Sequence, residues 1–156
     1  MDPSLYRPNV GVVLINRDGL VWYGRRAGSD AEHRWQFPQG GIDDGEDFEA
    51  AAIRELHEET GVTSVELLES TPGWIAYDFP PDYGGSKQAR GFKGQRQRWF
   101  AFRFTGEDTE VNLELHGEVE FDAWRWGRLS EAADLIVPFK RDAYRQVTEA
   151  FRHLAA

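Results

Sequence analysis

Apolar residues along the chain follow two different spacings, and these predict the secondary structure. Short segments that are continuously apolar, or that alternate apolar with polar residues, are typical of β-strands. Such segments are residues 10–15, 20–24, 35–38, 65–70, 74–79, 96–104 and 124–126. Residues 140–154 instead repeat their apolar side chains at helical spacing, which predicts an amphipathic helix near the end of the chain.

A second helix is expected in the acidic segment that ends at Gly61. Asp44 or Asp47 can cap its first turn, and Gly61 stands where a left-handed residue commonly follows a helix. Strands between two helices predict an α/β fold with a mixed sheet between helices, in a single domain over residues 1–156. The segment 82–95 contains four glycines and lacks apolar periodicity, so we expect a long, mobile loop of the kind that is often functional.

Composition restricts the classes of protein to which the chain can belong. It contains no cysteine, which excludes disulfides and thiolate metal sites and fits a reducing compartment. No apolar run reaches the roughly 18 residues of a membrane span, and the first residues do not resemble a signal peptide. We therefore expect a cytoplasmic protein without a membrane partner. The net charge of −9 argues against non-specific binding to DNA or other nucleic acid.

The acidic charge is concentrated between residues 43 and 59, where eight carboxylates accompany one arginine. Glu55, Glu58 and Glu59 have the spacing i, i+3 and i+4, so they share one helical face. Their mutual repulsion requires an opposing charge, and a divalent cation with hard oxygen ligands would provide it. A merely solvated acidic helix would explain the charge but not the fixed residues around it, which are Gly40, Glu46, Arg54 and Gly61.

Residues 40–62 match the pattern G-x5-E-x7-R-E-U-x-E-E-x-G-U at every position, where U is apolar. This pattern resembles the Nudix box. The resemblance implies an α/β/α sandwich and hydrolysis of a nucleoside diphosphate linked to another group. It also implies that two or more Mg²⁺ ions, or Mn²⁺ ions, are held by Glu55, Glu58, Glu59 and the Gly40 carbonyl.

The same resemblance suggests roles within the box. One glutamate should take the proton of the attacking water, and we favour Glu58 with Glu55 as the alternative. Glu46 and Arg54 are expected to hold the loop and the helix together.

Segments outside the box resemble one subgroup, the bacterial RNA pyrophosphohydrolases and the similar diadenosine tetraphosphate hydrolases. They are residues 6–11, 35–41, 93–95, 99–100, 120–126 and 139–141. In that subgroup Glu120 matches a further metal-binding glutamate supplied by a loop, with Glu118 as the nearby competitor. Tyr77 and Phe139 match two aromatic residues that sandwich a base, the alternative being that both belong to the core.

Basic residues provide candidate phosphate contacts by the same analogy. Arg7, Arg25, Arg26 and Lys140 are the candidates, and a solvated strand end is the alternative interpretation of Arg25 and Arg26. The four histidines lack ligand spacing, and we interpret all of them as structural or exposed: His33, His57, His116 and His153.

Three hypotheses for the function follow. The favoured one is an RNA 5′-pyrophosphohydrolase, because the four candidate cations and the residues Lys87, Arg90 and Lys93 exceed what a four-phosphate chain needs. The alternative is a dinucleoside polyphosphate hydrolase giving ATP and AMP. A nucleotide-sensing domain without catalysis is disfavoured, because all box glutamates are present. The substrate is the only partner that the sequence indicates, and protein partners are left open.

Overall fold

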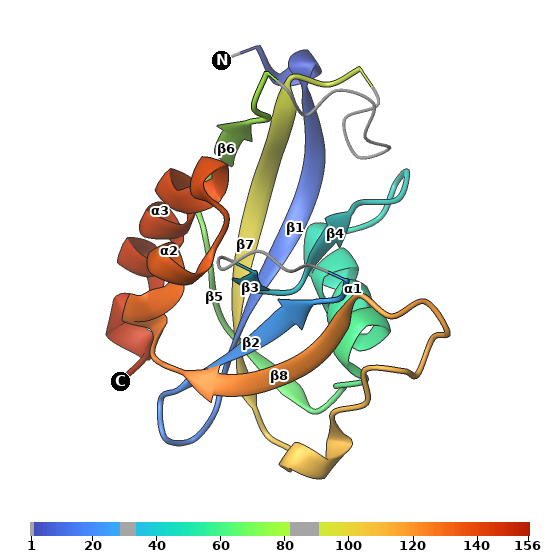
Figure 1. Cartoon of the computed structure of the whole chain (residues 1–156), viewed down its shortest axis with the longest axis vertical. Helices are drawn as coiled ribbons and strands as arrows, with labels where there is room; N and C mark the ends of the chain where they lie inside the picture. The colour runs from blue at the N-terminus through green and yellow to red at the C-terminus, as the bar shows by residue number, and fades with distance from the viewer. Residues whose placement is uncertain (1, 29–33, 82–90) are drawn as a thin grey trace.

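The computed structural model describes residues 2–28, 34–81 and 91–156. Its eight strands join one sheet (Figure 1). They are β1 (Tyr6–Ile15), β2 (Val21–Arg26), β3 (Trp35–Gln36), β4 (Gln39–Gly41), β5 (Val65–Ser70), β6 (Ile75–Asp78), β7 (Gly94–Phe104) and β8 (Phe121–Gly127). The α-helices are α1 (Phe48–Thr60), α2 (Ala132–Leu135) and α3 (Arg141–Phe151).

The sheet is mixed, as the sequence predicts. β1 and β7 run parallel over the whole length of β1, from Tyr6 opposite Gly94 to Ile15 opposite Arg103. The other pairings are antiparallel, and the strand order is β3-β2-β1-β7-β5. β4 pairs with β1, β6 with β7, and β8 with β2. This arrangement places β4, which precedes the acidic helix, beside the middle of the sheet.

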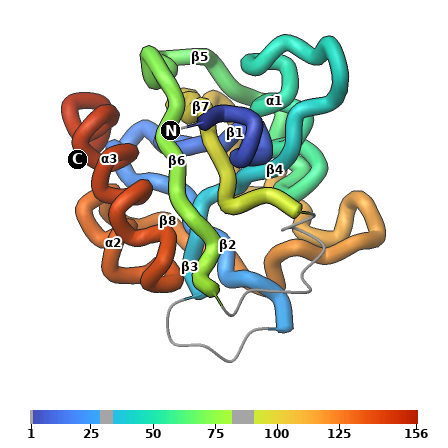
Figure 2. Tube along the Cα trace, turned by 90° about the horizontal axis from the view of Figure 1, so that it is seen from above, coloured from blue at the N-terminus to red at the C-terminus, as the bar shows by residue number. Residues whose placement is uncertain are grey.

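The core has two layers because side chains alternate along the long central strands. Val13 of β1 and Trp99 of β7 point toward α2 and α3, whereas Val12 and Phe100 point toward α1. Figure 2 shows α1 on one side of the strands and α2 with α3 on the other. The α/β/α sandwich expected from the sequence is therefore present.

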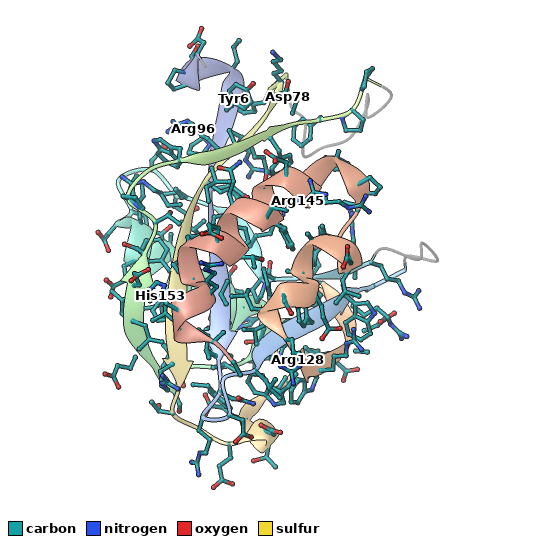
Figure 3. The ribbon with its side chains drawn as sticks, turned by 90° about the vertical axis from the view of Figure 1, so that its left-hand side faces the viewer. Tyr6, Asp78, Arg96, Arg128, Arg145 and His153 are labelled. Atoms are coloured by element: carbon teal, nitrogen blue, oxygen red, sulfur yellow. The ribbon has the colours of Figure 1, made fainter. Side chains whose placement is uncertain are left out.

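Two polar contacts tie outer elements to this sandwich, and Figure 3 labels three of the residues that form them, Tyr6, Asp78 and His153. The Tyr6 hydroxyl donates to Asp78 at 2.5 Å, which joins the start of β1 to the end of β6. His153 lies 3.0 Å from a Glu69 oxygen, which brings the end of the chain onto β5. Within the described part of the chain, every helix is too short or too polar to cross a membrane.

The structure differs from the predicted elements in a few places. β1 begins at Tyr6 rather than at residue 10, and β8 is longer than residues 124–126. Residues 111–120 carry neither helix nor strand. The four-residue helix α2 was not predicted, because so short a segment cannot display a helical period.

Candidate active site

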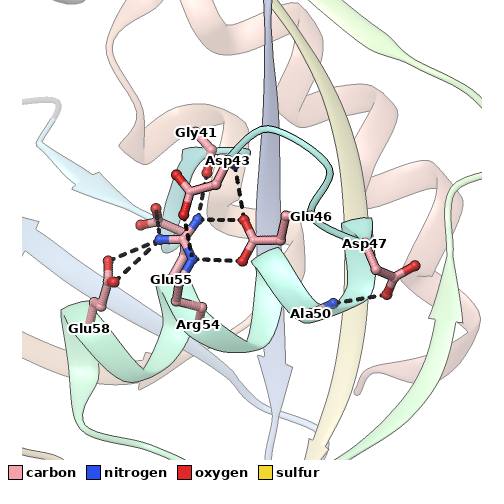
Figure 4. A network of polar contacts seen from close by, with 8 residues as sticks. All are labelled: Gly41, Asp43, Glu46, Asp47, Ala50, Arg54, Glu55 and Glu58. Carbon is pink, nitrogen blue, oxygen red and sulfur yellow. Dashed lines mark hydrogen bonds and ion pairs between the residues drawn. The ribbon is translucent and has the colours of Figure 1, made fainter.

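Helix α1 carries the acidic face and has well-defined ends. The Asp47 carboxylate accepts a hydrogen bond from the Ala50 N–H at 3.1 Å, so Asp47 rather than Asp44 is the cap (Figure 4). At the other end Gly61 has a φ of 78°, and its N–H donates to the His57 carbonyl at 2.9 Å. The buried side of the helix, which includes Leu56, packs against the sheet.

Arg54 connects this helix to the loop before it (Figure 4). Its guanidinium donates to both Glu46 oxygens, at 2.8 and 2.9 Å, and to the Gly41 carbonyl at 2.9 Å. It also contacts Glu55 at 2.9 Å and Glu58 at 3.2 Å. The hydrogen bonds from Arg54, with one from the Asp43 N–H, lower the pKa of Glu46 to about 2. The Arg54 guanidinium thus joins the loop to the helix and contacts Glu55 and Glu58 as well.

Carboxylates surround a cavity of about 360 Å³ above α1. Its walls are Glu55, Glu58, Glu59, His116, Glu118 and Glu120. The Glu59 carboxylate accepts from the Gln39 N–H at 3.2 Å. A Cβ at position 40 would overlap the Glu55 carboxylate, so any side chain there would displace that carboxylate from its present place. We call this cavity the acidic pocket.

The carboxylates of the acidic pocket are electrostatically unfavourable without a cation. Burial raises the pKa of Glu55 to about 7 despite the Arg54 contact. Burial also raises the pKa of Glu59 well above its ordinary value, and the charges of Glu120, Glu55 and Glu58 add to the effect. Among the described residues, no three acidic or histidine side chains lie close enough together in this structure to hold a metal ion. Hard oxygen donors that repel one another around an open space suit a divalent cation, which would draw them together.

A second cavity of about 220 Å³ adjoins the acidic pocket and shares Glu55, Glu59 and Glu120 with it. Its other charged walls are Arg7, Arg26 and Lys140. We call it the basic cavity. The Lys140 side chain is buried, and burial together with the charge of Arg26 lowers its pKa to about 8. A negatively charged group would fit between these cations and the carboxylate pocket.

Comparison with known proteins agrees with this geometry. A family model described as the NUDIX domain matches residues 5–147. The chain belongs to the Nudix family. Members of this family generally use divalent metal ions, and the predicted family membership is confirmed.

Relatives of this Nudix chain carry one recurring name. The chain is 60% identical over 156 residues to an RNA pyrophosphohydrolase of Caulobacter vibrioides, and the match covers 99% of this chain and 91% of that protein. It is 51% identical over 158 residues to an RNA pyrophosphohydrolase of Rhodopseudomonas palustris, covering 97% of this chain and 94% of that protein.

Solved structures show the same fold at low identity. A C. elegans Ap4A hydrolase complex matches with a TM-score of 0.63 and 18% identity, over 93% of this chain and 98% of the other. The E. coli dihydroneopterin triphosphate pyrophosphohydrolase matches with a TM-score of 0.67 and 21% identity, over the same shares. These two matches support the Nudix fold and carry no information on the substrate.

The structure places some expected substrate contacts of this Nudix protein elsewhere. Arg25 pairs with Asp122 at 2.6 Å and lies outside the basic cavity, whereas its neighbour Arg26 lines it. Lys93 lies 3.6 Å from Asp78. The predicted contacts Lys87 and Arg90 fall outside the described residues, as does His33.

The two aromatic residues expected to sandwich a base touch each other instead. The ring centroids of Tyr77 and Phe139 are 5.7 Å apart and the rings are tilted by 54°. Tyr77 is buried, and its hydroxyl donates to Gln95 at 2.6 Å. Because the rings are in contact, a base cannot lie between them in this arrangement. The base sandwich stays a prediction, and it would require one of the two touching rings to move.

Several residues of the site were missed by sequence reasoning. The basic cavity is also lined by Asn9, Gln36, Gln39, Phe79 and Gln95. The segments 6–11, 35–41 and 93–95 contain four of them, but nothing in those segments marks which side chains face inward. His116 lines the acidic pocket and contacts the ring of His57, with centroids 5.1 Å apart. Neither spacing nor a motif indicated His116.

Metal-free protein is expected to become more stable as the pH falls from about 8 to about 6. The pKa of Glu55 is about 7 in the folded state and 4.5 in its ordinary range, so the folded state binds the proton more tightly. The penalty is complete well above pH 7 and is relieved as the pH falls through 7 toward 4.5, by about 1–1.5 kcal/mol between pH 8 and pH 6. Urea denaturation at both pH values, with chelator, measures the difference. Glu55→Gln should reduce it, and an unchanged pH dependence in that variant would contradict the assignment.

Proposed function

We propose that this Nudix protein is a metal-dependent RNA 5′-pyrophosphohydrolase, which converts 5′-triphosphate ends to 5′-monophosphate ends and releases pyrophosphate. The observation that carries the proposal is the shared wall between the acidic pocket and the basic cavity. Glu55, Glu59 and Glu120 belong to both, so a phosphate chain held by the cations of one reaches the carboxylates of the other. The names of the relatives at 51–60% identity support RNA as the substrate.

The metal would be held by residues around the acidic pocket. Glu55, Glu58, Glu59 and Glu120, with the Gly40 carbonyl, would bind two or more Mg²⁺ or Mn²⁺ ions. Such ions neutralise phosphate charge and lower the pKa of bound water. Arg54 would keep Glu55 and Glu58 in place through its direct contacts.

Among the box glutamates, Glu58 is our choice for the residue that accepts the proton of the attacking water. Its side chain is 43% exposed, against 13% for Glu55, so water reaches it more easily. Glu59 already accepts from the Gln39 N–H and lies deeper. Glu55 remains the alternative, because it lines both the acidic pocket and the basic cavity.

Charge alone separates the two candidate substrates less than the sequence suggested. The basic cavity offers Arg7, Arg26 and Lys140, while Arg25 and Lys93 are paired with aspartates. The preference for RNA over a dinucleoside polyphosphate therefore rests mainly on the relatives.

Offered both substrates at equal concentration with Mg²⁺, the protein is expected to act at least about tenfold faster on RNA by kcat/KM, which corresponds to about 1.4 kcal/mol in the barrier. The products to be measured are pyrophosphate with 5′-monophosphate RNA, and ATP with AMP from diadenosine tetraphosphate. A tenfold preference in the opposite direction would replace the proposal by the dinucleotide hydrolase. Turnover of neither substrate would leave the nucleotide-sensing hypothesis.

A further inference from the structure

A buried amide network lies beneath the basic cavity and centres on Gln97. Gln97 is fully buried in β7. Its Oε1 accepts from the Trp99 indole N–H at 3.2 Å. Its Nε2 donates to Asn9 Oδ1 and to Gln39 Oε1, each at 2.9 Å. The network therefore joins β7, β1 and β4, of which β1 pairs with each of the other two strands (Figure 1).

The direction of these hydrogen bonds is fixed by Trp99. An indole nitrogen can only donate, so the carbonyl end of Gln97 must face it. The amide NH₂ of Gln97 then faces Asn9 and Gln39, and its two hydrogens serve their two carbonyl oxygens. As a consequence, the NH₂ groups of Asn9 and Gln39 must point away from Gln97.

The two residues whose NH₂ groups face away from Gln97 belong to the wall of the basic cavity. Asn9 and Gln39 both line it, although Asn9 is only 2% exposed. Across residues 2–28, 34–81 and 91–156, neither side-chain nitrogen has a hydrogen-bond acceptor. Neither belongs to the fully enclosed unpaired atoms, which are Trp22 Nε1 and Arg98 Nε. Because neither nitrogen is fully enclosed, an oxygen acceptor in the cavity can reach both and accept their hydrogen bonds.

We propose that Gln97 is a positioning residue that turns the NH₂ groups of Asn9 and Gln39 into the basic cavity as neutral donors to phosphate oxygens. Amides suit this place because Glu55, Glu59 and Glu120 share the cavity. An additional arginine or lysine would pair with those carboxylates, whereas an amide adds donors without adding charge. The inference rests on the proposed function only in that the cavity receives the phosphates of a nucleotide.

Nuclear magnetic resonance of the full ¹⁵N-labelled chain tests the direction of the network. The probe is a nucleoside triphosphate with methylene bridges between its phosphates, added to saturation with Mg²⁺. The side-chain NH₂ signals of Asn9 and Gln39 should shift more than that of Gln97. Unmoved Asn9 and Gln39 signals at saturation would overturn the proposal, and so would failure of the probe to bind.

A double-mutant cycle tests whether Gln97 acts through Asn9. Asn9→Leu should weaken binding of the same probe about tenfold, the effect of losing one hydrogen bond, and Gln97→Met should weaken it at least as much because it releases both Asn9 and Gln39. The double variant should bind about as well as Gln97→Met alone, because the contribution of Asn9 is already lost in that variant. Gln97→Asn, which keeps an amide, should bind better than Gln97→Met.

Gln95 provides the matched control for this cycle. It lies two residues from Gln97 and lines the cavity, but its Oε1 accepts from Tyr77 rather than bonding Asn9. Gln95→Met and Asn9→Leu should therefore have additive effects. Additive effects for Gln97→Met with Asn9→Leu, alongside a lower melting temperature, would assign Gln97 to packing only. A preference for diadenosine tetraphosphate would overturn the proposed substrate and leave these binding results unchanged.

Discussion

Replacing Glu58 or Glu59 by glutamine is expected to lower kcat by at least about 10³-fold, a loss of about 4 kcal/mol of transition-state stabilisation. Both side chains line the acidic pocket. An amide keeps the size of each side chain but cannot supply a charged ligand or accept a proton. Steady-state hydrolysis with excess Mg²⁺ measures the effect.

The folded state should survive both substitutions, which separates a chemical from a structural effect. The pKa of Glu59 is raised because its charge is buried near Glu120 and Glu55, so a neutral side chain there relieves repulsion. The Gln39 N–H can still donate to a glutamine oxygen at position 59. Metal-free Glu59→Gln should therefore melt no earlier than the unmodified protein.

Glu49→Gln is the matched control, because Glu49 lies in the first turn of the same helix and lines neither cavity. This variant should keep nearly full activity. Near-normal turnover in both Glu58→Gln and Glu59→Gln would remove the metal and base roles from this face. An equal loss in the control would point to general damage to α1.

The acidic face could be predicted because its geometry is local. Three glutamates spaced i, i+3 and i+4 share a face in any regular helix, whatever surrounds it. Gly61 likewise indicated its own left-handed conformation. The choice of Asp47 over Asp44 as the cap depends on where the preceding loop enters the helix, which the spacing does not specify.

The basic cavity could be predicted only in part, because it is built from segments far apart in the sequence. Asn9 and Gln97 meet through the parallel pairing of β1 with β7, in which the two are direct partners. That register cannot be obtained from the pattern of either strand alone. Arg25 and Arg26 show the same limit, since two adjacent arginines have different partners once β8 brings Asp122 next to Arg25.

Replacing Arg54, whose guanidinium joins the loop to the acidic helix, should be the most destabilising single change at the site. Arg54→Met is expected to lower the free energy of unfolding by about 2–3 kcal/mol at pH 7, because it leaves partly buried carboxylates without their partner. Arg54 is 28% exposed, which keeps the loss below that of a fully buried pair. Urea denaturation without metal measures it.

Arg54→Lys should recover little of this stability. A single ammonium cannot donate side by side to both Glu46 oxygens while also reaching the Gly41 carbonyl and Glu55. The double variant Arg54→Met with Glu46→Gln should lose less free energy of unfolding than the two single variants lose together. In the double variant the unpaired Glu46 charge that Arg54→Met leaves behind is absent.

The contribution of this contact should also depend on pH in a defined direction. The pKa of Glu46 is about 2 in the folded state against 4.5 ordinarily, so the folded state releases the proton more readily. The stability gained from the Glu46–Arg54 contact is therefore complete above pH 4.5 and is lost as the pH falls toward 2. The difference between the unmodified protein and Arg54→Met should narrow over that range. A difference that stays constant from pH 7 to about 3 would show that Arg54 stabilises the fold by packing rather than through the Glu46 carboxylate.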